Sequence, residues 1–191
     1  MIKHKNICNQ IHLPLQAGSD RILKRMNRTY TSREFLNLVD DIRIYLPECS
    51  LSTDIIVGFP GETDDDFLKL HNFVADIKFD RLGVFTYSEE EGTHGATLKD
   101  DVTMQVKTDR MDAIMLLQQE INLKKNQGLV GTKERILIDS HSEDGTSIGR
   151  SYRDAPEVDN FIRINEKLAI GEFIDVKITE AFEYDVKGEC L

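Results

Sequence analysis

Residues 52–63 constrain the fold most, because an apolar strand pattern there runs through a turn with glycines and a proline directly into a helix start. Junctions of this kind are typical of the loops at the carboxyl ends of strands in parallel α/β barrels, where active sites lie. A similar junction joins residues 11–16 to a helix that begins near Ser19, and residues 81–86 form a third strand candidate. The pattern therefore predicts a parallel α/β domain.

The chain changes character near Gly128. Before it, apolar periodicity and capping residues predict helices from about residues 31 to 46, 63 to 77 and 103 to 126. After Gly131, short apolar stretches alternate with tight turns and predict a small antiparallel β-barrel. Its five strands are expected at residues 135–139, 147–151, 160–164, 173–179 and 181–186. We accordingly expect two domains, residues 1–127 and residues 128–191.

The composition fits a globular protein, with 40% hydrophobic and 30% charged residues. The longest apolar runs fall far short of the ~20 residues that span a bilayer, and the basic start lacks the apolar core of a signal peptide. We therefore expect a cytoplasmic protein with no membrane partner. Cys8, Cys49 and Cys190 are too widely spaced for a disulfide framework or a C-x-x-C site, so no metal ligand is predicted.

Five motifs together resemble one enzyme family. They are HLPLQAGS at residues 12–19, MNRTYT at 26–31, TDIIVGFPGET at 53–63, FDRLGVFTYS at 79–88 and GRSYRDAPEVD at 149–159. They resemble motifs of the radical S-adenosylmethionine (SAM) methylthiotransferases, and the resemblance spans nearly the whole chain. It implies the later half of a radical-SAM (βα) partial TIM-like barrel followed by a five-stranded TRAM domain, the order that the periodicity also predicts.

The motifs are similar to two branches of this family. Residues up to about Thr63 resemble the MiaB-type branch, which methylthiolates a tRNA adenosine. Residues from Phe79 onward resemble the RimO-type branch, which methylthiolates an aspartate of a small-subunit ribosomal protein near the decoding centre. Residues 128–191 carry a net charge of −6, against −4 for residues 1–127. A domain that grips RNA is expected to be basic, so the acidic one favours the ribosomal protein over tRNA as partner.

The resemblance implies two cofactors, SAM and 4Fe-4S clusters. The family's Cys-x3-Cys-x2-Cys motif is absent from this sequence. We therefore expect the cluster ligands to lie outside this chain, in a missing N-terminal part of the same enzyme, and assign no catalytic residue here. The chain alone is expected to be inactive, with an open sheet edge at residues 11–16 that favours aggregation or dimerisation. The alternative from another class is a non-catalytic ribosome- or RNA-docking module with Met1 as a native start.

Four polar residues, three at the predicted strand ends and one just beyond the first short helix, are candidate SAM contacts. Gln16, Ser19 and Asp54 follow or end strands, where side chains can orient the hydroxyl and amino groups of SAM. Arg28 suits the SAM carboxylate, because its guanidinium is planar. Structural alternatives stay open for Ser19 as an N-cap, Asp54 in a buried ion pair and Arg28 as a C-cap. His12 is interpreted as a structural group.

Two glycines of the second junction, Gly58 and Gly61, are further candidate SAM contacts. Because glycine has no side chain, the backbone there can approach a flat ligand such as adenine closely. The alternative is that both glycines serve only a tight reversal of the chain.

One charged loop with an aromatic residue in the TRAM-like domain is a candidate substrate-docking surface. Its residues are Arg150, Tyr152, Arg153, Asp154, Glu157 and Asp159. Aromatic and charged side chains in one exposed loop are typical of docking surfaces. The alternative is a solvated turn whose shape Pro156 restricts.

Overall fold

The computed structural model of the protein describes residues 6–156 and 160–191. The chain divides into two compact units. The first is Ile11–Gln118, and the second combines Gln119–Leu191 with the start of the chain up to Gln10. This division falls within helix α4 (Met104–Leu129), whereas the sequence predicts a change of domain at residue 128. The predicted boundary stays a prediction.

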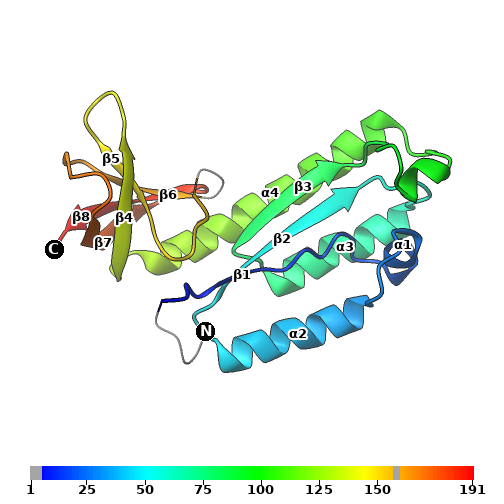
Figure 1. The fold of residues 1–191 in the computed structure, drawn as a ribbon, viewed down its shortest axis with the longest axis horizontal. Coiled ribbons are helices and arrows are strands. Elements are labelled where there is room, and N and C mark those ends of the chain that lie inside the picture. Colours follow the sequence, from blue (N-terminus) through cyan, green and yellow to red (C-terminus); the bar gives the residue numbers. More distant parts are fainter. Residues whose placement is uncertain (1–5, 157–159) are drawn as a thin grey trace. The chain divides into compact units, whose positions relative to one another are not determined.

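The first unit, the α/β unit, contains a three-stranded sheet with the strand order β1-β2-β3. Its strands are β1 (Gln10–His12), β2 (Ser50–Val57) and β3 (Arg81–Thr86). Its helices are α1 (Asp20–Arg25), α2 (Ser32–Tyr45), α3 (Asp64–Ile77) and the first part of α4. Strands β2 and β3 are parallel and α3 connects them (Figure 1). The predicted α/β class with parallel strands is confirmed.

Alternating side chains of β2 separate the core from an open face. Leu51, Ile55 and Val57 are almost fully buried, as are Leu70 and Val74 on the inner side of α3. Ser52, Asp54 and Ile56 point to the opposite face, because successive side chains in a strand alternate. That second face carries polar groups.

The first predicted strand, residues 11–16, is shorter in the structure. Strand β1 ends at His12, and Pro14 follows without a backbone donor. Pairing with β2 resumes only at Gln16, whose N–H donates to Asp54 O at 2.9 Å and whose carbonyl accepts from Ile56 N at 2.9 Å. Gln16 has a φ of 67°, a left-handed conformation that interrupts an extended strand. The sequence pattern therefore located the pairing but overestimated the regular strand.

Reciprocal caps define where α2 and α3 begin. The Thr31 hydroxyl accepts a hydrogen bond from Glu34 N, and the Glu34 carboxylate accepts one from Thr31 N at 2.8 Å. Thr63 and Asp66 form the same capping box at the start of α3. Each box satisfies two backbone donors that a helix end leaves open. Both helices begin where the sequence predicts.

Helix α4 buries polar as well as apolar side chains. Ile114 is fully buried, and Lys107 and Arg110 are also almost inaccessible. A buried lysine or arginine requires a partner, so α4 must contribute ion pairs to the α/β unit. Among the helices that the structure describes, none has a stretch apolar and long enough to cross a bilayer.

The second unit contains a closed barrel with the strand order β4-β5-β6-β8-β7. Its strands are β4 (Lys133–His141), β5 (Ser147–Arg150), β6 (Phe161–Ile164), β7 (Phe173–Ala181) and β8 (Asp185–Cys190). Its core is entirely aliphatic and consists of Ile136, Ile138, Ile162, Ile164, Val176, Ile178 and Val186. These inward residues alternate with outward ones, as a small barrel requires. The predicted five-stranded barrel is confirmed.

Two details of the barrel differ from the sequence prediction. The pairing of β6 with β8 is parallel, while the other four pairings are antiparallel. An odd number of strands around a closed ring cannot all alternate in direction, so at least one parallel pair is unavoidable. The last strand begins at Asp185 rather than at residue 181, because the chain reverses first and Phe182 N donates to Asp185 O at 2.9 Å.

Candidate functional site

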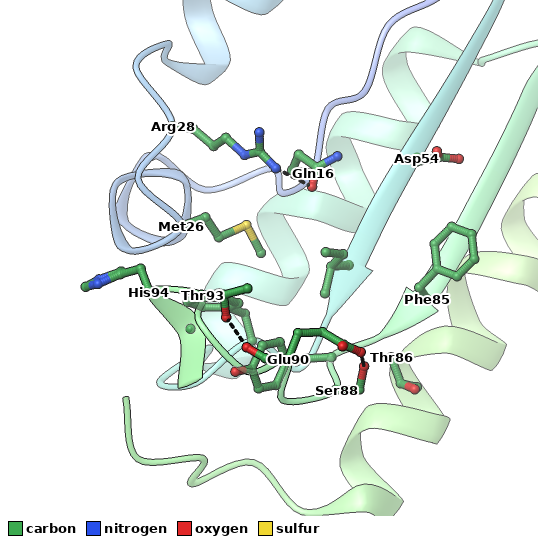
Figure 2. Close-up of a pocket in the computed structure, with 14 residues that line it drawn as sticks. Gln16, Met26, Arg28, Asp54, Phe85, Thr86, Ser88, Glu90, Thr93 and His94 are labelled. Carbon is green, nitrogen blue, oxygen red and sulfur yellow. Dashed lines mark hydrogen bonds between the residues drawn. The ribbon is translucent and has the colours of Figure 1, made fainter. Parts of the chain in front are cut away.

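A cavity of about 450 Å³ lies in the α/β unit, at the carboxyl ends of β2 and β3. Its lining comes from both strands, the turn after α1 and the loop after β3 (Figure 2). The lining residues are Gln16, Met26, Arg28, Asp54, Ile56, Phe59, Phe85, Thr86, Tyr87, Ser88, Glu90, Thr93, His94 and Gly95. Cavities of this size hold small-molecule ligands, and the strand ends of parallel sheets are their usual place.

The register of the sheet assembles one wall of the cavity. Asp54 is paired with Gly83, and Ile56 is paired with Phe85. Paired residues of parallel strands share a face, so both side chains of β2 and the Phe85 ring lie on the open side of the sheet. A Cβ atom on Gly83 would lie 2.6 Å from Asp54 Oδ1, so only glycine leaves room for this carboxylate.

Asp54 pairs with a histidine that sequence reasoning left out. His12 Nε2 lies 3.3 Å from Asp54 Oδ2, and His12 Nδ1 lies 3.0 Å from Ser52 Oγ. The structural alternative for Asp54 was a buried ion pair, but both side chains of the observed pair are about half exposed. His12 and Leu13 are neighbours in an extended segment, so their side chains point to opposite faces of the sheet. With Leu13 toward the core, His12 lies on the face of Asp54, and this alternation was the sequence signal for the pair.

Gln16 and Arg28 meet at the rim of the cavity. Arg28 Nη2 donates to Gln16 Oε1 at 3.0 Å, and Figure 2 shows both side chains beside Met26. The positive φ of Gln16 turns its side chain away from a regular strand position. Arg28 is exposed and still has donors that Gln16 does not use, because a guanidinium carries five N–H groups. This cation is therefore free to bind an anionic group.

Ser19 lies at the N-cap position of α1 but does not cap it with its side chain. Its hydroxyl donates to Asp66 Oδ1 at 2.6 Å, and Arg21 and Thr63 also donate to this carboxylate. Burial by itself raises the pKa of Asp66, but the hydrogen bonds from Arg21, Ser19 and Thr63 outweigh it and hold that pKa well below its usual range. Ser19 thus joins α1 to α3 and is not among the cavity-lining residues.

The two candidate glycines also have local structural roles. Gly58 has a φ of 70°, and a Cβ atom there would lie 2.3 Å from Lys107 Cγ. Gly61 has a φ of 82°, and its N–H donates to Asp101 Oδ1 at 2.6 Å. Residues other than glycine rarely adopt these backbone angles. Neither glycine lines the cavity, although Phe59 between them does.

Ion pairs of the buried Arg110 and Lys107 side chains support the loops beside the cavity. Arg110 of α4 lies 2.8 Å from Glu62 and 2.7 Å from Asp64. Burial raises the pKa of Glu62, while hydrogen bonds from Gly58 N and Arg110 oppose that rise. Lys107 pairs with Asp100 at 2.5 Å and also donates to Tyr87 O at 3.2 Å. These contacts join α4 to both loops beside the cavity.

The loop after β3 supplies cavity residues that sequence reasoning did not select. Ser88 Oγ donates to Glu90 Oε1, and Thr93 Oγ1 donates to Glu90 O at 2.8 Å (Figure 2). Tyr87 lies immediately after β3, and its hydroxyl is one of the few buried side-chain polar atoms of the described residues that lack a hydrogen-bond partner. Residues at the carboxyl ends of parallel strands form the site, but the sequence analysis considered only the first two strands. The same reasoning at the end of β3 would also have selected Tyr87 and Ser88.

The predicted docking residues of the barrel are mostly engaged within it. Arg150 forms an ion pair with Asp139, and Arg153 lies 2.7 Å from Glu134 and 4.5 Å from the ring of Tyr152. Two further predicted residues, Glu157 and Asp159, lie outside the described residues.

Asp154 belongs to the predicted docking set but is buried. It accepts a hydrogen bond from Ser151 Oγ at 2.8 Å. That contact fits a carboxylate that holds the turn after β5, because a buried acidic group requires a donor. The docking role of the set as a whole stays a prediction.

Comparison with known proteins matches both units. The profile of the radical SAM superfamily matches residues 1–74, and the profile of the TRAM domain matches residues 130–191. A ribosomal protein uS12 methylthiotransferase from Clostridioides difficile is 42% identical over 99% of this chain. Along nearly its whole length, this chain is similar to the radical SAM methylthiotransferases. The two profile matches agree with the observed order, in which a parallel α/β unit with a strand-end cavity precedes a small barrel.

Two other uS12 methylthiotransferases are similar to this chain to the same degree. The uS12 methylthiotransferases of Lachnoclostridium phytofermentans and Geobacter sulfurreducens are 44% and 41% identical over 95% and 97% of this chain. The chain spans only 41–44% of the length of these and similar curated relatives.

The donor set of this chain does not fit an iron–sulfur cluster. Radical SAM clusters are held by three thiolates, whereas Cys8, Cys49 and Cys190 are separated by at least forty positions. Among the residues that the structure describes, no three His, Cys, Asp or Glu side chains converge as metal ligands. We therefore derive no chemical step through a cluster bound by these residues.

Proposed function

We propose that this chain is part of a methylthiotransferase that modifies an aspartate of ribosomal protein uS12. The identity of 42% to a uS12 methylthiotransferase over 99% of the chain is the observation that carries the proposal. Relatives named for the same substrate align with both units, which favours the ribosomal-protein branch along the whole chain. Methylthiolation of a tRNA adenosine is the second candidate.

The cavity of the α/β unit is the proposed SAM site. Its volume of about 450 Å³ suits a ligand of this size, and its lining combines an apolar wall with a carboxylate and with the Arg28 guanidinium, which has donors beyond its bond to Gln16. When bound, SAM supplies the methyl group and the means of hydrogen abstraction from the substrate carbon. Arg28 binds the SAM carboxylate, Gln16 orients Arg28, and Asp54 accepts hydrogen bonds from hydroxyl or amino groups.

Ser19, Gly58 and Gly61 remain predicted SAM contacts. In the structure their polar groups or backbones are committed to Asp66, Glu62 and Asp101. We propose that they support the turns beside the cavity, and that their replacement changes SAM affinity through these turns.

Replacement of Arg28 tests the SAM site. Arg28→Ala is expected to weaken binding of SAM about tenfold, because a charge-assisted hydrogen bond to a carboxylate is lost. Lys24→Ala is the matched control, since Lys24 is an exposed cation of the neighbouring helix and does not line the cavity. Isothermal titration calorimetry on the purified chain measures both, and unchanged affinity of Arg28→Ala rejects the assignment.

The charges of the barrel support a protein substrate over RNA. Five of its eight lysine and arginine residues are already in ion pairs with acidic residues of the barrel. Phosphate binding requires lysine and arginine side chains that are available to neutralise it. The remaining acidic excess favours a basic protein segment, and we propose such a segment of the ribosomal protein as the partner.

Mass spectrometry decides between the two substrates. Ribosomal protein uS12 and total tRNA are isolated from cells with and without the intact gene. Loss of the methylthio group from uS12 alone supports the proposal, whereas loss from a tRNA adenosine alone supports the second candidate. If uS12 and tRNA are modified equally with and without the gene, a non-catalytic docking module describes the chain best.

The barrel loop is the proposed docking surface, and Tyr152 is its most informative residue. We expect Tyr152→Ala in the intact gene to lower the modified fraction of uS12 severalfold, because aromatic residues dominate binding at interfaces. Tyr184→Ala is the control, since Tyr184 is an exposed aromatic of another barrel loop. Equal modification in the two strains rejects the docking role. Asp154 is less suitable because its substitution breaks the hydrogen bond with Ser151.

We propose that cluster ligands outside this chain complete the enzyme. The purified chain is then expected to bind SAM without cleaving it, because none of its three cysteines can form a three-thiolate site with the others. Formation of 5′-deoxyadenosine by the purified, iron-reconstituted chain would contradict this expectation.

A further inference from the structure

The backbone and the ring of Tyr87 make specific contacts, whereas its hydroxyl group has no hydrogen-bond partner among the described residues. Its backbone N–H donates to Val57 O at 2.9 Å, and its carbonyl accepts from Lys107 Nζ at 3.2 Å. Its ring packs edge-on against Phe59 with the ring centroids 5.0 Å apart. It also belongs to a buried cluster with Ile22 and Leu23. The position of the hydroxyl is therefore set by the fold and not by a bond of its own.

This hydroxyl is buried without a hydrogen-bond partner among the described residues. The residue is 7% exposed, and its oxygen has no acceptor or donor within reach. Burial, together with the nearby Glu89 and Asp100, raises the pKa of Tyr87, so the phenol keeps its proton at neutral pH. Buried polar groups of native proteins are nearly always bonded, so an unpaired one calls for an explanation.

The surroundings of Tyr87 connect the hydroxyl with the cavity. Tyr87 lines the cavity, and so does Gly95, where a Cβ atom would lie only 2.9 Å from the Tyr87 oxygen. A side chain at this position would collide with the hydroxyl, so glycine lets the loop pass close to it. The neighbouring cavity walls are the apolar side chains of Ile56 and Phe59 together with Met26. A flat ring with an acceptor atom at its edge matches this combination of apolar walls and one buried donor.

We propose that the Tyr87 hydroxyl is a ligand-binding group that donates a hydrogen bond to the base of a nucleoside in the cavity. The inference rests on the proposed function, in which that nucleoside is the adenosine part of SAM. It adds a specific contact that selects a base with an acceptor at its edge. A protein that keeps an unpaired hydroxyl for its ligand gains affinity from it and loses stability when the ligand is absent.

Paired tyrosine substitutions test this contact. Tyr87→Phe is expected to weaken binding of SAM and of 5′-methylthioadenosine about five- to tenfold, because both share the adenosine part. The melting temperature of the ligand-free Tyr87→Phe chain should stay the same or rise by about 2 °C, since an unsatisfied group is removed. Calorimetry measures the affinities, and differential scanning fluorimetry measures the melting temperatures.

Tyr30→Phe is the matched control. Tyr30 packs against the same cluster, but its hydroxyl donates to the carbonyls of Pro14 and Leu15 at 3.2 and 3.0 Å, and it does not line the cavity. This substitution removes a satisfied hydrogen bond, so it should lower the melting temperature by about 2 °C and leave both affinities unchanged.

The outcomes separate this inference from the proposed function. Unchanged affinities of Tyr87→Phe, with normal binding by the wild-type chain, overturn the role of Tyr87 alone. A lower melting temperature of ligand-free Tyr87→Phe also overturns it, because the hydroxyl then has a structural partner such as a buried water. A wild-type chain that binds neither compound overturns the proposed SAM site together with the contact that depends on it.

Discussion

The two units of the molecule differ in where they place their charges. In the α/β unit, Glu62, Asp66, Lys107 and Arg110 are all buried beside the turns that form the cavity. In the barrel, the core is entirely aliphatic, pairs such as Lys187–Glu180 lie at the surface, and the buried acidic residues Glu134 and Asp154 lie outside that core. The first unit therefore depends on specific polar partners for its site, whereas the second depends mainly on apolar burial.

This difference has a consequence for function. Substitution of one partner of a buried ion pair strongly destabilises the folded state, because it leaves a charge without compensation in a medium of low dielectric constant. They also hold loops in one arrangement, which a ligand site requires. Surface charges on an aliphatic barrel can change with little effect on folding, which leaves that surface free to match a partner.

Arg110→Met should produce the largest destabilisation, because Glu62 stays buried without its cation. The expected loss is about 3–5 kcal/mol of the free energy of unfolding of the α/β unit. Hydrogen exchange measured by mass spectrometry resolves the two units, and faster exchange should appear in α3 and β2 but not in β4–β8. Loss of protection in the barrel of the same size would break the distinction between the units.

Ile178→Ala probes the opposite unit with a purely apolar change. Ile178 is fully buried in the barrel core, so the truncation removes buried surface and leaves a cavity. Such substitutions typically cost about 2–5 kcal/mol. Exchange should accelerate in the barrel strands, while SAM affinity of the α/β unit should stay at the wild-type value. A cost below about 1 kcal/mol would argue against an aliphatic core as the main source of stability there.

Asp66→Asn addresses the pH dependence of the α/β unit. The pKa of Asp66 is depressed in the folded protein, so its contribution to stability is present above the unfolded value near 3.9 and is lost as the pH falls through the folded value. Between about pH 5 and pH 2, the wild-type free energy of unfolding should fall more steeply than that of the variant. At pH 7 the variant should lose about 1–3 kcal/mol. Urea titrations followed by circular dichroism measure both, and parallel pH profiles would contradict the prediction.

Lys187→Gln should have the smallest effect. Its partner Glu180 is more than half exposed, and the N–O distance of 3.0 Å joins two groups at the barrel surface. Exposed ion pairs contribute at most about 1 kcal/mol. Thermal unfolding should therefore shift by less than about 4 °C. A loss comparable to that of Arg110→Met would show that the barrel also depends on its charges.

Much of the architecture could be predicted from local patterns. The capping box at Thr31 and the strand-turn-helix junction before Thr63 are encoded by neighbouring residues, and the helices begin there as expected. The edge strand was less predictable, because Pro14 and the left-handed Gln16 interrupt a pattern that otherwise suggests six extended residues. The last barrel strand was misplaced because alternation continues through the turn at Phe182.

The candidate site was only partly predictable. The sequence analysis selected Gln16 and Asp54 at strand ends and Arg28 just beyond the first short helix, and the fold brings all three to the cavity lining. It did not select Tyr87, because an aromatic residue after an apolar strand is indistinguishable by sequence from a core residue. The unpaired state of its hydroxyl depends on which atoms surround it, and these come from distant parts of the chain.

The sequence by itself determined the order of the elements, the α/β unit followed by a five-stranded barrel, and the excess of acidic residues in that barrel. Only the tertiary structure decided that Ser19 binds Asp66 across 47 positions, that His12 meets Asp54, and that β6 closes the barrel against β8. Periodicity, caps and turns arise from interactions between near neighbours, so they can be read along the chain. Partnerships between distant residues depend on how the packed elements align, and this alignment determines which polar groups are satisfied and which remain available to a ligand.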